Sequence, residues 1–322
     1  MCFSAEVWAG FREFEREFGA VLSIRRYADL FWELGRDGTW HKIPKAMRAA
    51  FAHPRNEEEM ELAKLVADGD RARVAALQQE IAEQSERLAD AEKILSSPKP
   101  TKKAANDQRI ATKKVKAAQR GLADLQRKEP VPADSRIFPG QYATVLITHE
   151  GQRILVPMRY QCRLPGWTEA IERKYPGSYN ARRDRLKESW SKLFGYHHGV
   201  IVAEALFENV WRHAAEQREL APGEEPENVV IEFKPVPRQS MLIACLWSFC
   251  KGRDGEPDLY SFAAITDEPP PEVIEAGHDR FVVQIKPENL DAWLDPDPNN
   301  LDAMYAILDD RPRPYYASRM AA

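Results

Sequence analysis

The first residue whose type and position could do unusual chemistry is Cys2, which directly follows Met1. Methionine is readily removed before a small residue such as cysteine, which would leave Cys2 with an α-amine and a thiol on adjacent carbons. Such a 1,2-aminothiol condenses with an aldehyde to a Schiff base, and the thiol then closes a thiazolidine ring. The α-amine has an ordinary pKa of about 8, so a useful fraction is neutral near pH 7. A lowered pKa or a nearby base would activate the thiol.

Three short motifs downstream carry polar groups suited to acid–base chemistry and anion binding. They are Tyr-Asn-Ala-Arg at 179–182, Leu-Phe-Glu at 206–208 and Gly-His-Asp-Arg at 277–280. Glu208 could shuttle protons, because imine formation needs one acid and one base step. His278 titrates near neutrality, and Asn180 is a neutral donor and acceptor. Each also has a structural interpretation: a salt bridge for Glu208, a loop hydrogen bond for His278 and a turn for Asn180.

Taken in order after Met1-Cys2, these motifs resemble the SRAP (SOS response-associated peptidase) family. Phe138-Pro139-Gly140 is similar to the family's Pro-Gly turn before its first long strand. Pro165-Gly166-Trp167 is similar to its Pro-x-Trp loop upstream of the asparagine. Each motif alone is short, and their common order makes the resemblance specific. It covers the chain on both sides of residues 57–130.

The resemblance implies catalytic roles for Cys2, Asn180, Glu208 and His278. Cys2 would supply the amine and the thiol, and Asn180 would hold the Cys2 terminus or the opened sugar. Glu208 and His278 would move protons. The implied function is a DNA-damage response protein that binds abasic sites in single-stranded DNA and forms a thiazolidine crosslink through Cys2. Autopeptidase activity at the Met1 bond and abasic-site lyase activity are also implied.

The resemblance also implies DNA contacts away from the reacting atoms. Arg182 and Arg280 would bind flanking phosphates, and Trp167 would stack on an unpaired base, although Trp167 equally suits a place in the core. Pro139 would contact DNA from its turn. The chain departs from the family at Ser4, where the family has an arginine that helps bind DNA.

Residues 57–130 differ in composition and predict an antiparallel helical hairpin. Apolar residues recur there at steps of three and four, with one polar member, as in the seam of a coiled coil. Prolines within 96–100 interrupt the pattern. The first stripe is Val74, Leu77, Ile81, Gln84, Leu88, Ala91 and Leu95, and the second is Ala111, Val115, Ala118, Leu122 and Leu125.

The two arms of this hairpin carry opposite charge. Residues 57–95 hold five basic and eleven acidic side chains, and residues 99–128 hold ten basic and two acidic ones. The arms could pair through flanking salt bridges. Alternatively, a basic strip could bind nucleic acid or another protein; its members would be Lys102, Lys103, Lys113, Lys114 and Lys116.

The rest of the chain predicts an α+β fold with a mainly antiparallel sheet and flanking helices. β-Branched and apolar runs predict strands over 143–148, 152–158, 199–203, 229–233, 241–247, 260–266 and 280–285, and helices over 288–294 and 301–308. The resemblance implies an SRAP-like open barrel for this part. We therefore expect a catalytic core of residues 1–56 and 131–322, with residues 57–130 inserted into it.

Composition excludes several other classes of protein. The net charge of the 322 residues is −4, so a DNA-binding surface must be local. The longest apolar run, 241–247, is too short to cross a bilayer, and no secretory signal is evident. Four cysteines without CxxC spacing predict neither zinc nor a disulfide framework. We expect a cytoplasmic, nucleoid-associated monomer without cofactor or metal.

Two functional alternatives remain at this point. The departure at Ser4 is consistent with a catalytically reduced module that binds DNA or recruits a protein partner through the hairpin. A protease acting on other proteins would also use an N-terminal nucleophile, but no substrate-binding feature in the sequence supports it.

Overall fold

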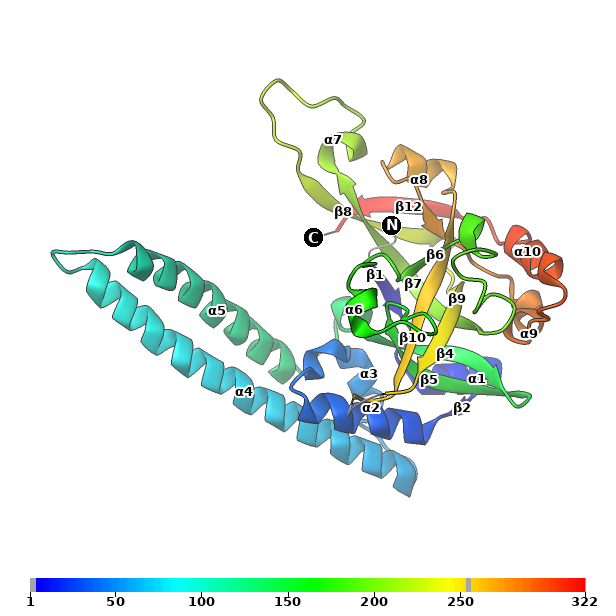
Figure 1. Ribbon diagram of the computed structural model, residues 1–322, viewed down its shortest axis with the longest axis horizontal. Coiled ribbons are helices and arrows are strands. Elements are labelled where there is room, and N and C mark those ends of the chain that lie inside the picture. The colour runs from blue at the N-terminus through cyan, green and yellow to red at the C-terminus, as the bar shows by residue number, and fades with distance from the viewer. Residues whose placement is uncertain (1–3, 253–255, 322) are drawn as a thin grey trace. The chain divides into compact units, whose positions relative to one another are not determined.

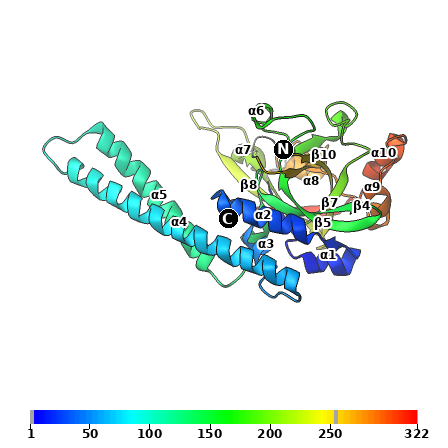
Figure 2. The same ribbon diagram turned by 60° about the horizontal axis from the view of Figure 1, so that its bottom comes forward.

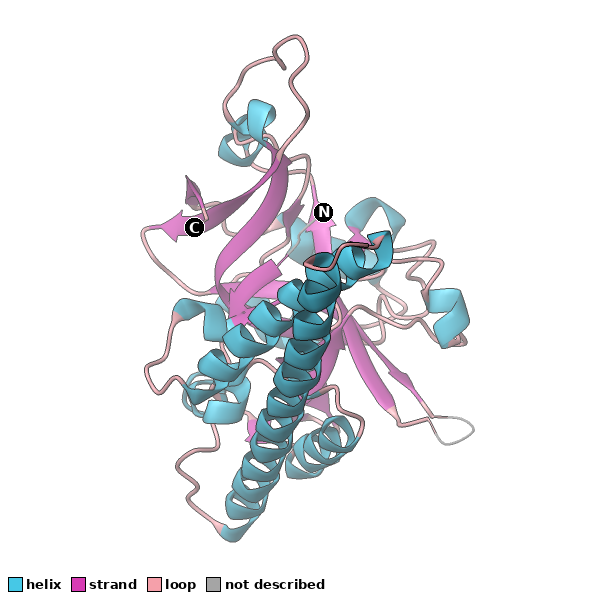
Figure 3. Cartoon of the chain, turned by 90° about the vertical axis from the view of Figure 1, so that its left-hand side faces the viewer, coloured by secondary structure: helices cyan, strands magenta, loops and turns pink. Residues whose placement is uncertain are grey.

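The computed structural model describes residues 4–252 and 256–321. The chain divides into two compact units. The first comprises Met1–Tyr27, Lys42–Ala50 and Pro132–Ala322, and the second comprises Ala28–His41 and Phe51–Val131. All strands of the described residues belong to the first unit, and the second consists of helices and loops (Figure 3).

Strands of the first unit close into a ring. β10 pairs with β5, β5 with β4, β4 with β7, β7 with β9, and β9 again with β10 (Figure 1). Within this ring, all pairings except β10–β5 are antiparallel. The strands, in chain order, are β1 (Ser4–Val7), β2 (Val21–Leu22), β3 (Arg136–Ile137), β4 (Tyr142–His149), β5 (Gln152–Tyr160), β6 (Asn180–Arg182), β7 (His198–Trp211), β8 (Asn228–Val236), β9 (Met241–Cys250), β10 (Leu259–Asp267), β11 (Phe281–Val282) and β12 (Tyr315–Met320).

The long strand β7 belongs both to the ring and to a second group of strands. Its first part pairs with β9 as far as Ala203. Its second part pairs with β1 on one side and β8 on the other, and these continue to β3 and β12. Buried side chains such as Val145, Phe233 and Phe262 fill the core of this unit. The predicted α+β fold with a mainly antiparallel sheet is confirmed.

Short helices flank the sheet and join its strands. They are α1 (Phe11–Phe18), α3 (Lys45–Ala49), η2 (Pro132–Ser135), α6 (Glu169–Glu172), η3 (Arg183–Arg185), α7 (Arg212–Ala215), α8 (Pro271–Glu275), η4 (Pro287–Asn289), α9 (Leu290–Leu294) and α10 (Leu301–Asp309), while η1 (Trp40–Lys42) lies at a boundary of the units. The helices predicted over 288–294 and 301–308 are therefore confirmed. Among the described residues, no helix combines the length and the apolar character needed to cross a bilayer.

The strand predicted over 280–285 is shorter than its sequence pattern indicates. Only Phe281–Val282 pairs with β10 as a strand. Beyond it, Gln284 bridges Ile243 of β9, and the amide of Ile285 donates to the carbonyl of Leu242. The segment thus changes partner strand within five residues, so it does not form one regular ladder.

The second unit contains most of helix α2 (Ile24–Arg36) and the long helices α4 (Glu57–Leu95) and α5 (Lys102–Gln126). Helices α4 and α5 lie side by side as a hairpin, as Figures 1 and 2 show. Asn56 and Thr101 cap their N-termini, because their side chains accept hydrogen bonds from backbone amides of the first turn. The residues of both predicted stripes are buried or half-buried. The predicted hairpin is confirmed.

The part of α4 nearest its N-terminus packs on an indole rather than on α5. The Nε1 of Trp40 donates to Asp70 Oδ1 at 2.8 Å. A Cβ added at Gly69 would lie 2.5 Å from atoms of the Trp40 ring. Trp40 lies outside residues 57–130 but packs on a helix inside them. The boundaries of the predicted insertion, before residue 57 and after residue 130, therefore stay a prediction.

We expect Gly69→Ala to lower the urea midpoint of unfolding. The methyl group would force the Trp40 indole away from the helix, and such overpacking typically costs about 1–3 kcal/mol. This cost should exceed the gain of about 1 kcal/mol that alanine brings in helix propensity. The matched control is Gly121→Ala in α5, where the added Cβ would lie 3.6 Å from Leu77, an ordinary contact. That variant should be as stable as wild type or more stable. Equal stabilisation by both substitutions would contradict close packing of the indole on Gly69.

Candidate active site

A buried carboxylate and a buried imidazole meet at the second part of β7. Glu208 has no exposed surface, and His278 is 6% exposed. The Oε2 of Glu208 lies 3.4 Å from the Nε2 of His278. The structure therefore brings together two of the predicted catalytic residues, which come from motifs seventy positions apart.

The position of His278 depends on the end of helix α8. Gly277 has a positive φ of 88°. The amide of Gly277 donates to the carbonyl of Ile274, and the amide of His278 donates to that of Val273. This pair of hydrogen bonds is a Schellman motif, which terminates a helix with a glycine in the left-handed region. The Ala-Gly-His sequence thus ends the helix and sets the direction of the imidazole.

The hydrogen bonds of His278 fix which ring nitrogen carries the proton. Its Nδ1 lies 2.6 Å from the backbone carbonyl of Arg280, which only accepts, so Nδ1 must donate. Burial lowers the pKa of His278 below its ordinary value. The ring is therefore mostly neutral at pH 7, with the Nε2 lone pair directed to the Glu208 carboxyl. Together the carboxyl group and the imidazole could take up a proton and give it back in a reaction.

Asn180 lies on the short strand β6, opposite Ala264 of β10. Its side chain is largely buried, and neither its amide nitrogen nor its oxygen has a hydrogen-bond partner among the described residues. A buried polar group without a partner costs about 1–3 kcal/mol. No hydrogen bond links Asn180 to Glu208 or His278 within this part of the chain. The amide is thus available to a group that the described residues do not supply.

Two predicted DNA contacts, Arg182 and Arg280, lie on segments that flank the end of β10. Arg182 pairs with Thr266, which also pairs with Val282, two residues after Arg280. Arg182 donates to both carboxylate oxygens of Asp184, at 2.9 and 2.6 Å. These hydrogen bonds lower the pKa of Asp184, and the nearby charge of Arg280 lowers it further. Strand pairing therefore brings both arginines to the same end of β10.

Trp167 is half-buried and contacts a second aromatic ring. Its ring centroid is 4.9 Å from that of Tyr175, with 31° between the planes. Tyr175 is 55% exposed. Both rings line a cavity of about 550 Å³ whose other walls include Ser178 and Trp190. Trp167 is therefore only partly covered by the described residues and lines this cavity.

Pro139 belongs to a tight turn between β3 and β4. The amide of Gly140, whose φ is 93°, donates to the carbonyl of Tyr160. The Tyr160 ring is in edge contact with Tyr179, the residue before Asn180. The Pro-Gly turn and the Asn-Ala-Arg strand thus share one aromatic neighbour.

Sequence reasoning missed Arg136 as a neighbour of the N-terminal strand. Its Nε donates to Ser4 Oγ at 2.9 Å, and its guanidinium lies 3.8 Å from the centroid of the Phe207 ring. Alternate strand residues face opposite sides, so Phe207 and Arg136 lie on the side away from Glu208. The sequence offers only one signal, a cation three residues before Pro139. It does not show that this cation reaches Ser4, 132 residues away.

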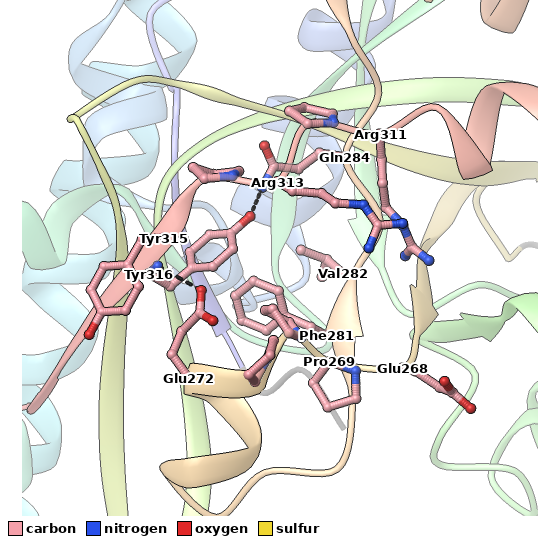
Figure 4. A pocket seen from close by; sticks show the side chains of 14 residues that line it. Glu268, Pro269, Glu272, Phe281, Val282, Gln284, Arg311, Arg313, Tyr315 and Tyr316 are labelled. Carbon is pink, nitrogen blue, oxygen red and sulfur yellow. Dashed lines mark hydrogen bonds between the residues drawn. The ribbon is translucent and has the colours of Figure 1, made fainter.

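A cavity of about 530 Å³ adjoins the loop that carries His278. Phe281 and Tyr316 form its apolar wall, and Arg311 and Arg313 reach its edge together (Figure 4). Arg311 pairs with Asp267 at 2.5 Å. In the described ranges, 4–252 and 256–321, no cluster of histidine, cysteine and carboxylate side chains is suited to a metal ion.

Cys2 lies outside the described residues. The other predicted site residues fall into three places: Glu208 with His278, Asn180 with Arg182 and Arg280 around the end of β10, and Trp167 with its cavity. Pro139 is joined to the second of these through Tyr160.

A ring of mainly antiparallel strands with a buried carboxylate–imidazole pair on its longest strand defines an α+β protein with a candidate acid–base site. Residues 101–320 match the family described as "SOS response associated peptidase (SRAP)". The match covers more than half of the chain, and the chain belongs to this family. Membership indicates a function associated with DNA damage and suggests DNA binding.

Solved structures with a similar fold have low sequence identity to this chain. A protein of Bordetella bronchiseptica is 18% identical with a TM-score of 0.45, over 61% of this chain and 90% of its own. A protein of Bacteroides thetaiotaomicron is 14% identical with a TM-score of 0.46, over 58% and 78%. A phage-related protein of Bordetella bronchiseptica is 16% identical with a TM-score of 0.43, over 61% and 85%. No curated protein matches the chain.

Proposed function

We propose that the protein binds abasic sites in single-stranded DNA and forms a covalent thiazolidine crosslink through Cys2 after removal of Met1. The observation that supports this function best is the buried Glu208–His278 pair, with 3.4 Å between Oε2 and Nε2. A binding surface for DNA needs no such pair. Condensation of an amine with an aldehyde is accelerated by such a pair, because a proton must be removed and another delivered.

A short stretch of chain joins Cys2 to a strand that lies beside this pair. Ser4, the first described residue, pairs with Phe207, the residue before Glu208. Consecutive Cα atoms are about 3.8 Å apart, so the Cα of Cys2 lies within about 7.6 Å of that of Ser4 in any conformation. We propose that this short connection lets the amine and the thiol of Cys2 approach Glu208.

The proposed reaction joins one aldehyde and one aminothiol with loss of one water. The α-amine of Cys2 adds to the aldehyde carbon of the opened abasic sugar, giving a carbinolamine. Its hydroxyl takes a proton and leaves as water, which produces the Schiff base. The thiol sulfur then bonds to the same carbon, and the thiol proton passes to the nitrogen. The product is a thiazolidine attached to DNA.

Glu208, His278 and Asn180 have distinct parts in this scheme. The Nε2 lone pair of His278 accepts a proton during opening of the sugar or attack by the amine. The proton taken up by the pair then reaches the departing oxygen. Asn180 offers a buried donor and acceptor that would pair with the Cys2 terminus or the sugar hydroxyls, which would remove the cost of leaving both without partners.

The DNA strand would be held on both sides of the lesion. Arg182 and Arg280 bind flanking phosphates, and Trp167 stacks on an unpaired base beside its cavity. Pro139 contacts DNA from its turn. The same acid–base pair would assist hydrolysis of the Met1–Cys2 bond and, through the Schiff base, β-elimination of the 3′ phosphate. These are the proposed autopeptidase and lyase activities.

We further propose that residues 57–130 form an insertion into a catalytic core of residues 1–56 and 131–322. The insertion would then be the part of the chain free to acquire a separate role. Trp40 packs on Gly69 of α4. A variant in which residues 57–130 are deleted would lose this contact, so its stability should depend on where the deletion begins and ends.

Intact mass spectrometry before and after incubation with abasic single-stranded DNA tests the main proposal. We expect the purified protein to lack Met1, because the aminothiol exists only when Cys2 is the terminus. Incubation should then add the mass of the DNA minus one water. Undamaged DNA of the same sequence is the control and should add nothing. Retention of Met1 in nearly every molecule would contradict the mechanism.

A catalytically reduced module that recruits a protein partner through the hairpin is the second candidate. Ser4 favours it, because a serine stands where the family has an arginine. Ser4 accepts a hydrogen bond from Arg136 instead. This candidate would take precedence if wild-type protein formed no crosslink with single-stranded, duplex-junction or gapped abasic DNA.

A further inference from the structure

The outer side of helix α5 carries a row of basic side chains that the candidate active site does not use. Lys102, Arg109, Lys113, Lys116 and Arg120 are all exposed, and we call them the α5 row. They follow each other after seven, four, three and four residues. At about 100° per residue they fall within about 40° of one line along the helix, and at about 1.5 Å per residue the row is about 27 Å long.

The structure separates this row from the lysines that face α4. Lys114 lies 3.6 Å from Glu80 of α4. Lys103 lines a cavity together with Glu83, Glu86 and Asp90. On the helix, Lys103 and Lys114 are about 100–120° away from Lys102. Of the five lysines predicted to form a basic strip, two therefore face the acidic arm, and three belong to the α5 row.

The charges of the α5 row have little compensation within the second unit. In the described part of the chain, no ion pair neutralises any of the five, and Arg109 donates only to the neutral side chain of Asn106, at 2.9 Å. Like charges along one line repel each other, and a polyanion placed beside them would remove this repulsion. The row thus favours a partner with repeated negative charge.

We propose that the α5 row binds the phosphate backbone of DNA as a second contact surface, separate from the candidate active site. Each strand of a DNA duplex carries a phosphate about every 3.4 Å along the axis, so repeated negative charge is available over the whole length of the row. The face is rich in lysine and has no aromatic or methionine side chain, whereas the centres of protein–protein interfaces are depleted of lysine. A nucleic acid fits this composition better than a protein does.

The salt dependence of binding to an undamaged single-stranded oligonucleotide tests this surface. The variant Lys113→Gln/Lys116→Gln removes two charges of the row. The matched control, Lys103→Gln/Lys114→Gln, removes two charges that face α4. Each lost phosphate contact should reduce the slope of log K against log salt by about 0.7. We therefore expect a decrease of about 1.4 for the row variant and no change for the control.

Glutamine keeps nearly the helix propensity of lysine, and circular dichroism checks that both variants remain helical. Equal slopes in wild type and both variants would overturn the proposal, and so would an equal decrease in the control. If the row variant kept the DNA slope but lost binding to polyglutamate, the row would belong to an acidic protein partner. Because the oligonucleotide carries no lesion, its binding does not depend on the Cys2 chemistry. If the row variant showed the expected decrease in slope but wild-type protein never crosslinked abasic DNA, only the proposed Cys2 chemistry would be contradicted.

Discussion

Cys2→Ser protein is expected to give a borohydride-trapped product with abasic single-stranded DNA but no crosslink that survives heating. The substitution keeps the α-amine, so the Schiff base still forms. The serine hydroxyl is a far poorer nucleophile than the thiol, so ring closure fails. Denaturing electrophoresis of heated and borohydride-treated samples separates the two products.

Two further variants sharpen this comparison. Cys2→Ala should behave like Cys2→Ser, because the imine needs only the amine. Cys250→Ser is the matched control: Cys250 is a partly exposed thiol elsewhere in the fold, and its loss should leave the crosslink unchanged. A heat-stable crosslink formed by either Cys2 variant at the wild-type yield would show that Cys2 is not the acceptor.

Glu208→Gln and His278→Ala are each expected to slow crosslink formation, or its reversal, by about 10²–10⁴-fold. Each substitution removes one member of the acid–base pair while leaving the amine and the thiol intact. Initial rates must be measured, because a slow condensation can still reach a high yield. DNA affinity should change little. The control is Glu204→Gln, on the same strand, where the carboxylate accepts hydrogen bonds from Trp8 and Ser240. It should keep the wild-type rate.

The pH dependence of the crosslinking rate tests whether His278 acts as the proton acceptor. Burial lowers the pKa of His278 below 6.5. As the pH falls through this lowered pKa, a proton occupies Nε2 and the ring can no longer accept one. The wild-type rate should therefore show an inflection below pH 6.5 that is absent from His278→Ala. If both Glu208→Gln and His278→Ala matched wild type across about pH 5 to 8, only Cys2 would remain of the proposed site.

The sequence predicts the helical hairpin well because its signal is local and repeated. Leu77 and Ala91 in one arm, and Ala111 and Ala118 in the other, are buried at the expected spacing. The partition of the lysines is harder to foresee. Lys113 and Lys114 are neighbours in sequence, yet one faces solvent and the other faces Glu80. That distinction depends on which side of α5 meets α4.

The candidate site is only partly predictable because its groups meet through long-range pairing. The motifs select Glu208 and His278 separately, but their approach requires β7 and the end of α8 to lie together. The contact between Arg136 and Ser4 joins residues that no local pattern relates. The shortening of β11 also depends on long-range pairing, since the segment that pairs with β10 goes on to bridge β9 at Gln284.

The arrangement of β1 determines how mechanical load would enter the fold. A pull on DNA attached to Cys2 would reach the protein through Ser4–Val7, a strand joined to β7 and β3 but absent from the closed ring. Strand β1 could be peeled away while every pairing of the ring stays in place. Under load, the N-terminal strand would thus detach first while the ring of strands stays folded. The covalent bond would still hold the DNA.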